Sequence, residues 1–372
     1  MTQKSVLISG AGIAGATAAF WLSRSGWNVT IVEKAAQIRS SGNPIDVRGQ
    51  AASIVHQMGL WPEIQRSATG VDTLVVVDAQ GRRRATVATR TTPDPQKEVE
   101  VARATLASVL LKAATNDAEL IVGDSISDIA QYAGGVDVGF ASGRRRRFDI
   151  VLGADGLHSN VRRLVFGPEG DFSRPFGMFV GTMRTTLEGG DASEVVMFNR
   201  PNISLSVHPA GGEPLAAFIF RSRERYDRHS AEARKHLVTS AYSGQGWQTD
   251  EAVAEWCASD DVYFDEVTRI AMPSWSRGRV GLLGDAANCI SLLGEGSSTA
   301  IVAAKTLSDA LAAHPNDQPY AFAAYEAVHR RRLRALQRFA GVSSHFLVPT
   351  SRSGLWLRNS GLALASGRRR QH

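Results

Sequence analysis

The chain has 372 residues, of which 43% are hydrophobic and 21% charged, and a net charge of +6; these values are typical of a globular enzyme of about two domains. Its two cysteines, Cys257 and Cys289, exclude a disulfide framework and favour a reducing, cytoplasmic compartment. No apolar run approaches the ~20 residues of a membrane span, and the short apolar stretch near the N-terminus is no signal peptide.

The positive charge is concentrated in four runs of arginine. A nucleic-acid surface would need such runs on one face, with aromatic residues between them. Two runs are flanked instead by strand-like segments, as hairpin tips are, and one lies at the C-terminal end: Arg82–Arg84, Arg144–Arg147, Arg330–Arg332 and Arg368–Arg370. We therefore expect solvated arginines, a general attraction for anionic cofactors and no nucleic-acid partner.

The N-terminal segment predicts a β-turn-α-turn-β unit. Val6–Ser9 indicates a buried strand, about Ala14–Ser25 a helix and Asn28–Val32 a second strand. The first turn carries the glycine fingerprint of dinucleotide-binding folds, Gly10-Ala11-Gly12-Ile13-Ala14-Gly15. Its glycines permit a tight turn, a close approach of backbone N–H groups to a pyrophosphate, and close packing of the helix on the strand. The helix N-terminus favours phosphate groups.

The residue after the second strand narrows the choice of dinucleotide. Glu33 is placed to hydrogen-bond the ribose hydroxyls of adenosine, and a carboxylate there disfavours a 2′-phosphate. The unit is therefore expected to hold FAD or NAD rather than NADP. Its predicted cofactor-binding residues are Gly10, Gly12, Ile13, Ala14, Gly15, Glu33 and Lys34.

The rest of the chain predicts a second architecture interleaved with the first. Helices are expected at about 51–58, 104–114, 231–242, 251–258, 297–312, 320–340 and 354–365, with a hairpin formed by 73–77 and 84–88. Between Met178 and Arg223 hydrophobic residues recur at every second position, which predicts an antiparallel sheet with one face covered. This sheet supplies the substrate-lining candidates Met178, Phe198, Phe218 and Phe220, about half of which should face the other way. His208 either faces the same cavity or is a hydrogen-bonded histidine of the sheet.

Two further motifs carry a family resemblance. They are Gly153-Ala154-Asp155-Gly156-Leu157-His158-Ser159-Asn160-Val161-Arg162 and Gly278-Arg279-Val280-Gly281-Leu282-Leu283-Gly284-Asp285-Ala286-Ala287. With them the chain resembles, over essentially its whole length, the class A FAD-dependent aromatic hydroxylases of the para-hydroxybenzoate hydroxylase fold. It is most similar to their smaller branch, which contains salicylate hydroxylases and the tetracycline-inactivating monooxygenase.

The resemblance implies an α/β fold with a Rossmann-like FAD-binding domain, an inserted, mostly antiparallel β-sheet substrate domain and C-terminal helices. The FAD-binding domain is expected to be discontinuous, with residues 1–72, 101–172 and 271–330. The substrate domain takes residues 73–100 and 173–270, and the C-terminal helical segment takes 331–372. Such interleaving places a ligand cleft at the domain interface.

The resemblance also implies roles for single residues. By position, Asp285 corresponds to the residue that hydrogen-bonds the ribityl chain, and Arg103 to one that approaches FAD. Asp46 corresponds to a flavin contact and Arg39 to a contact with NADPH. Asp155 corresponds to a residue with a structural role near FAD and NADPH. Arg48 is expected to face the isoalloxazine from the same segment as Asp46. From the residues alone, Asp155 with Arg162 also fits a cap and ion pair within a turn, Asp46 with Arg48 an ordinary loop pair, and Arg39 an exposed loop position.

The segment after the third motif departs from the family pattern. The family has His, and Pro before Gly-x-Gly; here the sequence is Asn288-Cys289-Ile290-Ser291-Leu292-Leu293-Gly294-Glu295-Gly296, with Asn for His, no Pro and one residue fewer. Gly294 and Gly296 are retained and open a helix. The N–H groups of Gly296 and Ser297 are expected to stabilise negative charge on the reduced flavin. The shortened loop bears on where oxygen and substrate sit.

The resemblance implies an FAD-dependent monooxygenase that uses NADPH or NADH as a transient co-substrate. It would hydroxylate a small aromatic or polycyclic substrate with O2 through a C4a-hydroperoxyflavin. Because the chemistry belongs to the cofactor, no catalytic side chain and no metal are expected. The W-x-W-x-I-P motif of flavin-dependent halogenases is absent, and a pyridine-nucleotide dehydrogenase would leave the second and third motifs unused. The alternative is a non-hydroxylating flavoprotein, an oxidase or redox module, on the same fold; either would be a monomer or homodimer.

Overall fold

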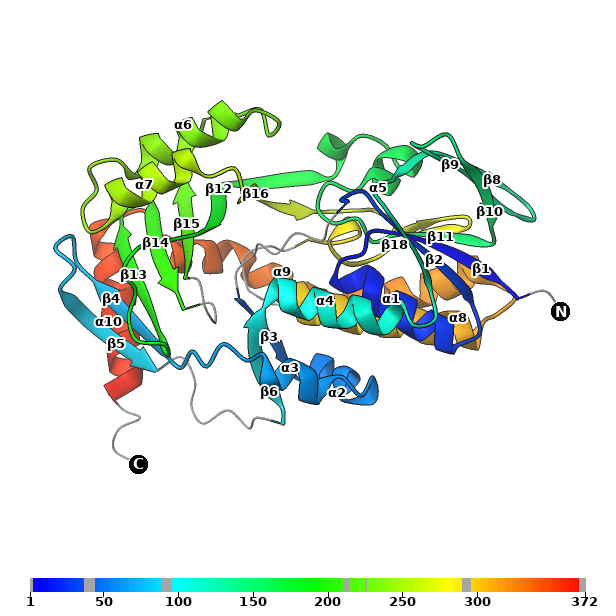
Figure 1. The fold of residues 1–372 in the computed structure, drawn as a ribbon, viewed down its shortest axis with the longest axis horizontal. Coiled ribbons are helices and arrows are strands. Elements are labelled where there is room, and N and C mark those ends of the chain that lie inside the picture. The colour runs from blue at the N-terminus through cyan, green and yellow to red at the C-terminus, as the bar shows by residue number, and fades with distance from the viewer. Residues whose placement is uncertain are drawn as a thin grey trace.

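The computed structural model describes residues 3–36, 44–88, 96–209, 214–224, 226–289 and 296–367, without the side chains of 335–346 and 362–367. Two bodies lie side by side: β1 and β2 belong to one, and the strands β4, β5 and β13 to β15 belong to the other (Figure 1). Arg39 and Gly294, both predicted to contact the cofactor, lie outside the described residues.

A largely parallel sheet forms the centre of the first body. Its strand order is β17-β18-β11-β1-β2-β7, and every pair is parallel except β17 with β18. Val6, Leu7 and Ile8 of β1 are fully buried, because helices and a second sheet cover both faces, as is usual for parallel sheets. The strands are β1 (Ser5–Ser9), β2 (Asn28–Glu33), β7 (Glu119–Val122), β11 (Ile150–Gly153), β17 (Ser276–Arg277) and β18 (Val280–Leu282).

Helices pack against this sheet and against one another. The contact pairs α1 with α4, α1 with α8 and α8 with α9 build a helical layer beside the sheet (Figure 1). The small side chains of α1, Ala16, Ala18 and Ala19, are buried and allow close approach. The helices are α1 (Ile13–Arg24), α2 (Gln50–Gln57), α3 (Trp61–Arg66), α4 (Arg103–Ala114), α5 (Asn160–Val165), α8 (Gly296–Ala313) and α9 (Gln318–Leu347).

Two smaller sheets complete the first body. β8 (Ile126–Tyr132), β9 (Gly135–Phe140) and β10 (Arg145–Phe148) form an antiparallel three-stranded sheet. β3 (Pro44–Arg48) pairs with β6 (Glu98–Ala102). The end of the segment 73–100 was expected in the substrate domain. Because β6 pairs with β3, this end lies in the first body instead.

The second body is built on a seven-stranded sheet with the order β16-β12-β15-β14-β13-β4-β5. All its pairs are antiparallel except β13 with β4, and its strands come from two distant parts of the chain. They are β4 (Thr73–Val77), β5 (Arg83–Ala88), β12 (Ser173–Arg184), β13 (Glu194–Arg200), β14 (Ile203–His208), β15 (Leu215–Arg221) and β16 (Val262–Ile270). The hydrophobic residues that recur at every second position thus belong to strands of the inserted sheet, as predicted.

The helices α6 (Ala231–Tyr242) and α7 (Thr249–Ala258) cover one face of this sheet (Figure 1). The core between them is aromatic: the ring of Phe218 lies edge-on to Tyr242 at 5.1 Å and to Trp256 at 5.2 Å between centroids, a favourable geometry. A Cβ at Gly181 would lie 2.8 Å from the Trp256 ring, so the glycine is needed for this packing.

The last two helices tie the two bodies together. α9 packs against α8, and Leu347, its last residue, and Val348, the next, pack against Met178 of the second sheet. α10 (Arg352–Gly367) follows and contacts β5 and β13. Within the described residues, the search for a helix both long and apolar enough to span a bilayer finds none.

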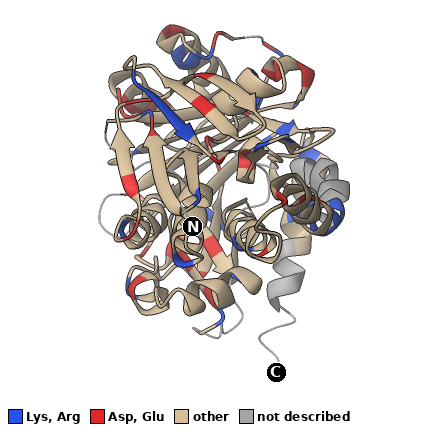
Figure 2. Cartoon of the chain, turned by 90° about the vertical axis from the view of Figure 1, so that its right-hand side faces the viewer, with Lys and Arg blue, Asp and Glu red and all other residues tan. Residues whose placement is uncertain are grey.

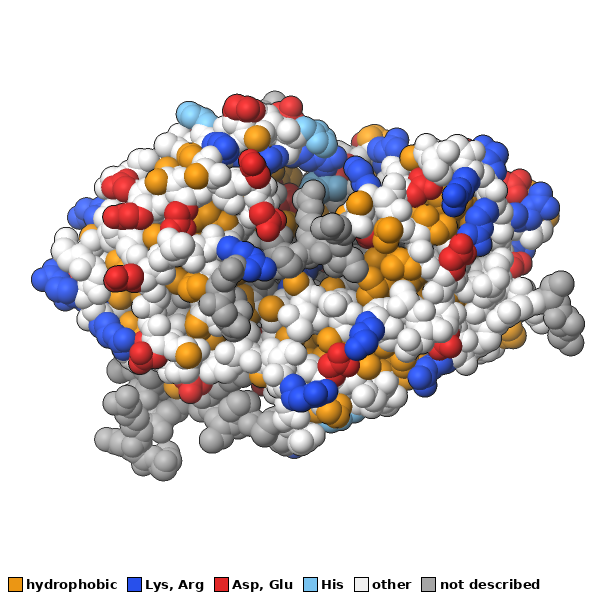
Figure 3. Space-filling model, viewed as in Figure 1, with side chains coloured by type: hydrophobic (Ala, Val, Ile, Leu, Met, Phe, Trp, Pro, Cys, Tyr) orange, Lys and Arg blue, Asp and Glu red, His pale blue; other side chains and the backbone are white. Residues whose placement is uncertain are grey.

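Arginines and acids are interspersed over the surface (Figures 2 and 3). In the predicted hairpin-tip run, Arg145 pairs with Asp128 at 2.9 Å, Arg146 with Glu119 at 2.7 Å and Arg147 with Asp137 at 2.9 Å. Asp137 lies on the adjacent strand β9, Asp128 on β8 of the same sheet and Glu119 on β7 of the parallel sheet. Such exposed pairs contribute little to stability, but they offset much of the charge of this run.

Candidate cofactor site

The structure requires glycine at two of the three glycine positions of the first motif, for different physical reasons. Gly10 has a left-handed φ of +103°, and a Cβ there would lie 2.5 Å from the carbonyl oxygen of Ala154. A Cβ at Gly15 would lie 2.0 Å from the carbonyl oxygen of Gly10. A Cβ at Gly12 would meet nothing within 4 Å. The fold itself therefore requires Gly10 and Gly15, whereas Gly12 borders open space.

That open space lies at the N-terminus of α1. Gly12 is the N-cap, makes no side-chain cap hydrogen bond, and is followed by a first turn without acidic residues. The first N–H groups of this 12-residue helix have no intrahelical partner and carry the positive end of its dipole. This is the arrangement that binds phosphate groups. Ile13 and Ala14 are buried, so they can contribute through their backbone N–H groups.

Glu33 stands at the end of β2 and is held by backbone groups. One carboxylate oxygen accepts a hydrogen bond from the N–H of Ala11 at 2.9 Å, and the other accepts one from the N–H of Ala35 at 2.9 Å. The first bond ties the acid to the glycine turn. Glu33 is therefore rigidly positioned beside the open space, and the exposed Lys34 follows it.

Asp155 of the second motif caps α5. Its carboxylate accepts hydrogen bonds from the N–H groups of Asn160 at 2.9 Å and Val161 at 3.0 Å, and from the hydroxyl groups of Ser159 and Ser9. Burial raises the pKa of Asp155, while these donors oppose the rise. The interpretation of Asp155 as a cap is therefore the one that its contacts support; the cap also joins the end of β1 to α5.

Arg162 connects the second motif to the third. Its side chain is fully buried and donates hydrogen bonds to the carbonyl oxygens of Ala286 at 3.1 Å and Leu157 at 2.6 Å, and to the carboxylate of Glu169 at 3.2 Å. Burial lowers the pKa of the guanidinium, against the attraction of Glu169 and Asp155. A buried arginine with these partners holds the two motifs in one register.

The third motif packs directly on the first. Gly284 has φ +62°, and a Cβ there would lie 2.9 Å from the Cβ of Ala14 in α1. Asp285 follows in the short 3₁₀ helix η2 (Gly284–Ala286). Burial raises the pKa of its carboxyl, and both the charge of Arg103 and a hydrogen bond with the Cys289 thiol oppose the rise. Asp285 nonetheless keeps accessible surface, so a ligand can reach it.

The start of α8 lies next to Asp285 and is hydrogen-bonded to β3. The Ser298 hydroxyl donates to the carbonyl oxygen of Asp46 at 2.8 Å and accepts from the N–H of Arg48 at 3.4 Å. The Cβ position of Gly296 lies 4.0 Å from an Asp285 carboxylate oxygen. Arg103 begins α4 directly after β6, which pairs with β3. The described candidates Asp46, Arg48, Arg103, Asp285, Gly296 and Ser297 thus come from four separate segments that meet here.

A cluster across the two bodies was not foreseen from the sequence. His158, after β11, lies with one ring nitrogen 2.9 Å from Glu169 and the other 3.1 Å from Asp265 on β16. Glu169 belongs to the short helix η1 (Glu169–Asp171). Partial burial opposes protonation, but both carboxylates outweigh it and raise the pKa of His158 to about 9. We call His158, Glu169 and Asp265 the interbody cluster; only the motif position of His158 could have signalled it.

Tyr263 is a second residue that sequence reasoning missed. It lies on β16 opposite Thr182, and the charges of Arg103 and Asp285 both act on its hydroxyl. Burial raises its pKa, as do Asp265 and Asp285, while Arg103 opposes them. The Tyr263 hydroxyl therefore lies within electrostatic range of Arg103 and Asp285 of the cofactor site. No motif marks this tyrosine; only the strand register reveals it.

The structure corrects most of the predicted substrate-lining set. Phe198, Phe218 and Phe220 are at most 1% exposed and fill the core beneath α6 and α7, so they do not line a cavity on the other face. Met178 is fully buried against Val267 and Val348. Successive residues of a strand point to opposite faces, and these three aromatic residues lie on the face that the helices cover.

His208 lies on the face opposite those aromatic residues. Its neighbour Val207 belongs to the core beneath the helices, and successive residues of a strand point to opposite faces. A ring nitrogen of His208 lies 3.0 Å from the Ser206 hydroxyl. Burial lowers the pKa of His208 to about 4, so its ring is neutral near pH 7 and serves as a hydrogen-bonding group.

Together these contacts define a class of protein. A glycine turn with an uncapped helix N-terminus, an acid at the end of β2 and a second acid beside another helix N-terminus are joined by direct contacts: Glu33 accepts from the glycine turn, and Gly284, next to Asp285, packs on Ala14. A dinucleotide needs these groups along its length: N–H donors for the pyrophosphate and carboxylate acceptors for the sugar hydroxyls. The residues present fit FAD.

Comparisons with known proteins give the family. The family model described as FAD binding domain matches residues 3–340. An uncharacterized protein of Mycobacterium tuberculosis is 36% identical over 340 residues, which are 87% of this chain and 89% of that protein. A flavin-dependent monooxygenase of Legionella longbeachae is 32% identical over 356 residues, 92% of this chain and 90% of its own. The crystal structure of tetracycline destructase Tet(51) is similar with a TM-score of 0.85 and 28% identity, over 98% of this chain and 96% of that chain.

The chain belongs to the FAD-binding domain family and, within it, to the class A FAD-dependent monooxygenases. The resemblance and the fold class predicted from the three motifs are thereby confirmed.

Proposed function

We propose that this FAD-dependent monooxygenase consumes NAD(P)H and hydroxylates an aromatic or polycyclic small molecule with O2. The observation that carries the proposal is the convergence of the three motifs on the uncapped start of α1 and on Asp285. The flavin, when bound, supplies the redox and oxygen-transfer chemistry. The similarity to a tetracycline destructase supports a polycyclic substrate.

The chain's own residues bind and orient the cofactor. The N–H groups after Gly12 would hold the pyrophosphate, and Glu33 the adenosine ribose. Asp285 would accept hydrogen bonds from the ribityl hydroxyls, an arrangement that offsets the cost of a partly buried carboxylate. Arg48, Arg103 and the N–H groups of Gly296 and Ser297 would face the ring system and stabilise negative charge there. We retain Asp46 as a flavin contact and Asp155 as the structural cap.

A positively charged cavity supports the use of NAD(P)H. It measures about 430 Å³ and includes Arg174, Arg269 and Arg330, with Asn288 of the third-motif segment in its wall. The Nε of Arg269 is buried and has no hydrogen-bond partner within the described part of the chain. Arg174 and Arg269 lie directly opposite each other on β12 and β16, a destabilising pair of like charges that an anion would relieve. The phosphates of a nicotinamide nucleotide suit this cavity.

The substrate would lie between the cofactor and the face of the second sheet that carries Tyr263 and His208. This face joins apolar groups such as Ile219 to neutral hydrogen-bonding groups such as Ser206. Such a lining suits a planar, oxygen-bearing molecule. The domain division proposed from the sequence, with residues 73–100 and 173–270 as the substrate domain, is kept with β6 assigned to the cofactor domain.

The experiment compares two aspartate variants of the purified protein. We expect wild type to show the absorbance of bound FAD, to oxidise NADPH or NADH and to consume O2. Asp285→Ala should be largely free of FAD, because it removes the acceptor for the ribityl hydroxyls. Asp309→Ala is the matched control, since Asp309 is exposed on α8 and pairs with Lys305; it should keep full occupancy.

Full FAD occupancy in Asp285→Ala would refute the assignment of the site. A yellow wild-type protein that is inert toward both nicotinamide nucleotides across a panel of aromatic and polycyclic compounds would favour the alternative, a non-hydroxylating flavoprotein. The altered sequence of residues 288–296 is the observation behind that alternative.

A further inference from the structure

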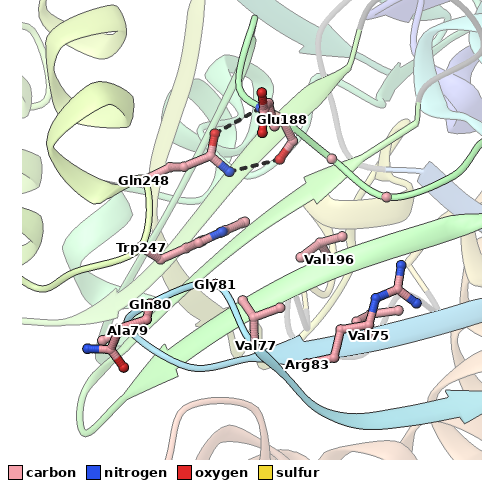
Figure 4. Close-up of a pocket in the computed structure, with 12 residues that line it drawn as sticks. Val75, Val77, Ala79, Gln80, Gly81, Arg83, Glu188, Val196, Trp247 and Gln248 are labelled. Carbon is pink, nitrogen blue, oxygen red and sulfur yellow. Dashed lines mark hydrogen bonds between the residues drawn. The ribbon is translucent and has the colours of Figure 1, made fainter.

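A cavity unrelated to the cofactor site lies at the far edge of the second sheet. It measures about 560 Å³. Val75 and Val77 of β4 and Val196 of the adjacent strand β13 line it from the sheet, and Trp247 and Gln248 line it from the segment before α7 (Figure 4). The volume lies in the range of small-molecule sites.

Trp247 is held in a conformation that a bulky residue rarely adopts. Its φ is +50°, in the left-handed region. Its N–H donates a hydrogen bond to the carbonyl oxygen of Ala79 at 2.6 Å, and its indole ring borders Gly81, where a Cβ would lie 3.5 Å from the ring. Residues held in such strained conformations cluster at functional sites. Here the strain presents an indole ring to the cavity.

The surroundings of Trp247 are fixed before any ligand arrives. The Gln248 side chain accepts a hydrogen bond from the N–H of Glu188 at 2.8 Å and donates one to the carbonyl oxygen of Glu188 at 2.8 Å (Figure 4). These reciprocal bonds join the wall that carries the tryptophan to the loop opposite. The indole N–H makes no hydrogen bond within the described residues. A rigid aromatic wall with an available donor is therefore present.

The charges around the cavity select among aromatic ligands. Arg83 is engaged by both carboxylate oxygens of Glu194, at 2.9 and 2.7 Å, so its charge is offset. Glu188 is the carboxylate in the lining itself, and Glu194 lies outside the lining. The balance is negative, which disfavours an anionic ligand.

The cavity is too far from the cofactor site to serve the flavin. Asp265 and Tyr263 place β16 against the cofactor domain, and β13 is four strands away in the order β16-β12-β15-β14-β13, about 19 Å at ~4.8 Å per strand. The three valines also belong to, or flank, the core on the side of α6 and α7. Figure 1 shows β4 and β5 at the opposite end of the molecule from β1 and β2.

We propose that this cavity is a second small-molecule site, which binds a neutral planar aromatic compound carrying a hydrogen-bond acceptor. The ring would stack on Trp247 above the valines, and the acceptor would receive the indole N–H. Stacking on a rigid aromatic residue contributes beyond simple burial. The site is separate from the oxygen chemistry, so its occupancy requires no turnover.

The test is calorimetric titration of the FAD-loaded protein with quinoline, a neutral ring with an acceptor, and with 2-naphthoate, its anionic counterpart. We expect quinoline to bind and 2-naphthoate to bind about tenfold more weakly or not at all. Trp247→Phe keeps a ring but loses the donor, and should weaken quinoline about fivefold. Gln80→Trp, at an exposed turn position of the rim, should block the cavity without touching the core. Trp356→Phe is the control, since Trp356 is 68% exposed on α10.

Flavin absorbance recorded during the titration separates the two sites. Quinoline in the far cavity leaves the flavin spectrum unchanged, whereas binding beside the flavin would alter it. The proposal is overturned if quinoline binds no better than 2-naphthoate. It is also overturned if Trp247→Phe and Gln80→Trp both bind quinoline as Trp356→Phe does. Failure of NAD(P)H oxidation would refute the proposed function and leave the quinoline result intact.

Discussion

Arg162 offers the sharpest test of how the three motifs are held together. We consider Arg162→Met, which keeps the length of the side chain and removes its charge and donors. The substitution leaves the carbonyl oxygens of Ala286 and Leu157 without these partners and removes one partner of Glu169. Glu169 keeps His158, so no carboxylate is left alone.

The magnitude follows from these contacts. A buried acceptor left unsatisfied costs about 1–3 kcal/mol, and Arg162 serves two. The variant no longer buries a guanidinium, which recovers part of that cost. We expect a net loss of about 3 kcal/mol in the free energy of unfolding. FAD should also bind more weakly, because Ala286 directly follows Asp285.

Arg163→Met is the matched control. Arg163 is the next residue and is exposed, and its side chain hydrogen-bonds only the Asn160 side chain among the described hydrogen bonds, so a loss within about 0.5 kcal/mol is expected. Urea unfolding followed by circular dichroism measures the first quantity, and fluorescence titration with FAD measures the second. If Arg162→Met stayed within about 1 kcal/mol of Arg163→Met and bound FAD equally well, Arg162 would not be the link between the motifs.

Three further outcomes are expected. Gly15→Ala should destabilise the protein strongly, because its Cβ would lie 2.0 Å from a backbone oxygen, whereas Gly12→Ala, with nothing within 4 Å, should keep its melting temperature and lose FAD affinity; equal melting temperatures for the two variants would contradict this. His158 has its pKa raised to about 9 from 6.5, so the stability it contributes is complete below pH 6.5 and is lost as pH rises through 9. With the side chain 37% exposed, solvent screening reduces that contribution to about 1 kcal/mol, seen as a steeper loss between pH 7 and 10 in wild type than in His158→Gln; parallel curves would exclude it. Phe218→Ala should cost about 3–4 kcal/mol, as a core residue does, and leave FAD affinity unchanged; a small loss of stability would argue that Phe218 lines a cavity after all.

Much of the cofactor domain follows from local sequence. The glycine turn, the acid at the end of β2 and the two later motifs each encode a local backbone shape that does not depend on distant parts of the sequence. Gly10 and Gly15 are dictated by contacts of less than 3 Å with backbone atoms, and the buried run Val6–Ile8 by coverage on both faces of a parallel sheet. The period-two pattern likewise predicted the inserted sheet. It could not say which face meets the cofactor, because alternation is symmetric between two faces.

Only the tertiary structure decided what each face and each polar side chain does. Phe198, Phe218 and Phe220 suit a substrate cavity or a core equally well by type, and the packing of α6 and α7 assigned them to the core. Tyr263, the interbody cluster and the cavity beside Trp247 depend on strand register and on segments more than 100 residues apart, which no local pattern records. The sequence by itself determined the family and the cofactor, because motifs encode backbone geometry. The structure determined the contacts between elements, because these depend on how whole faces pack.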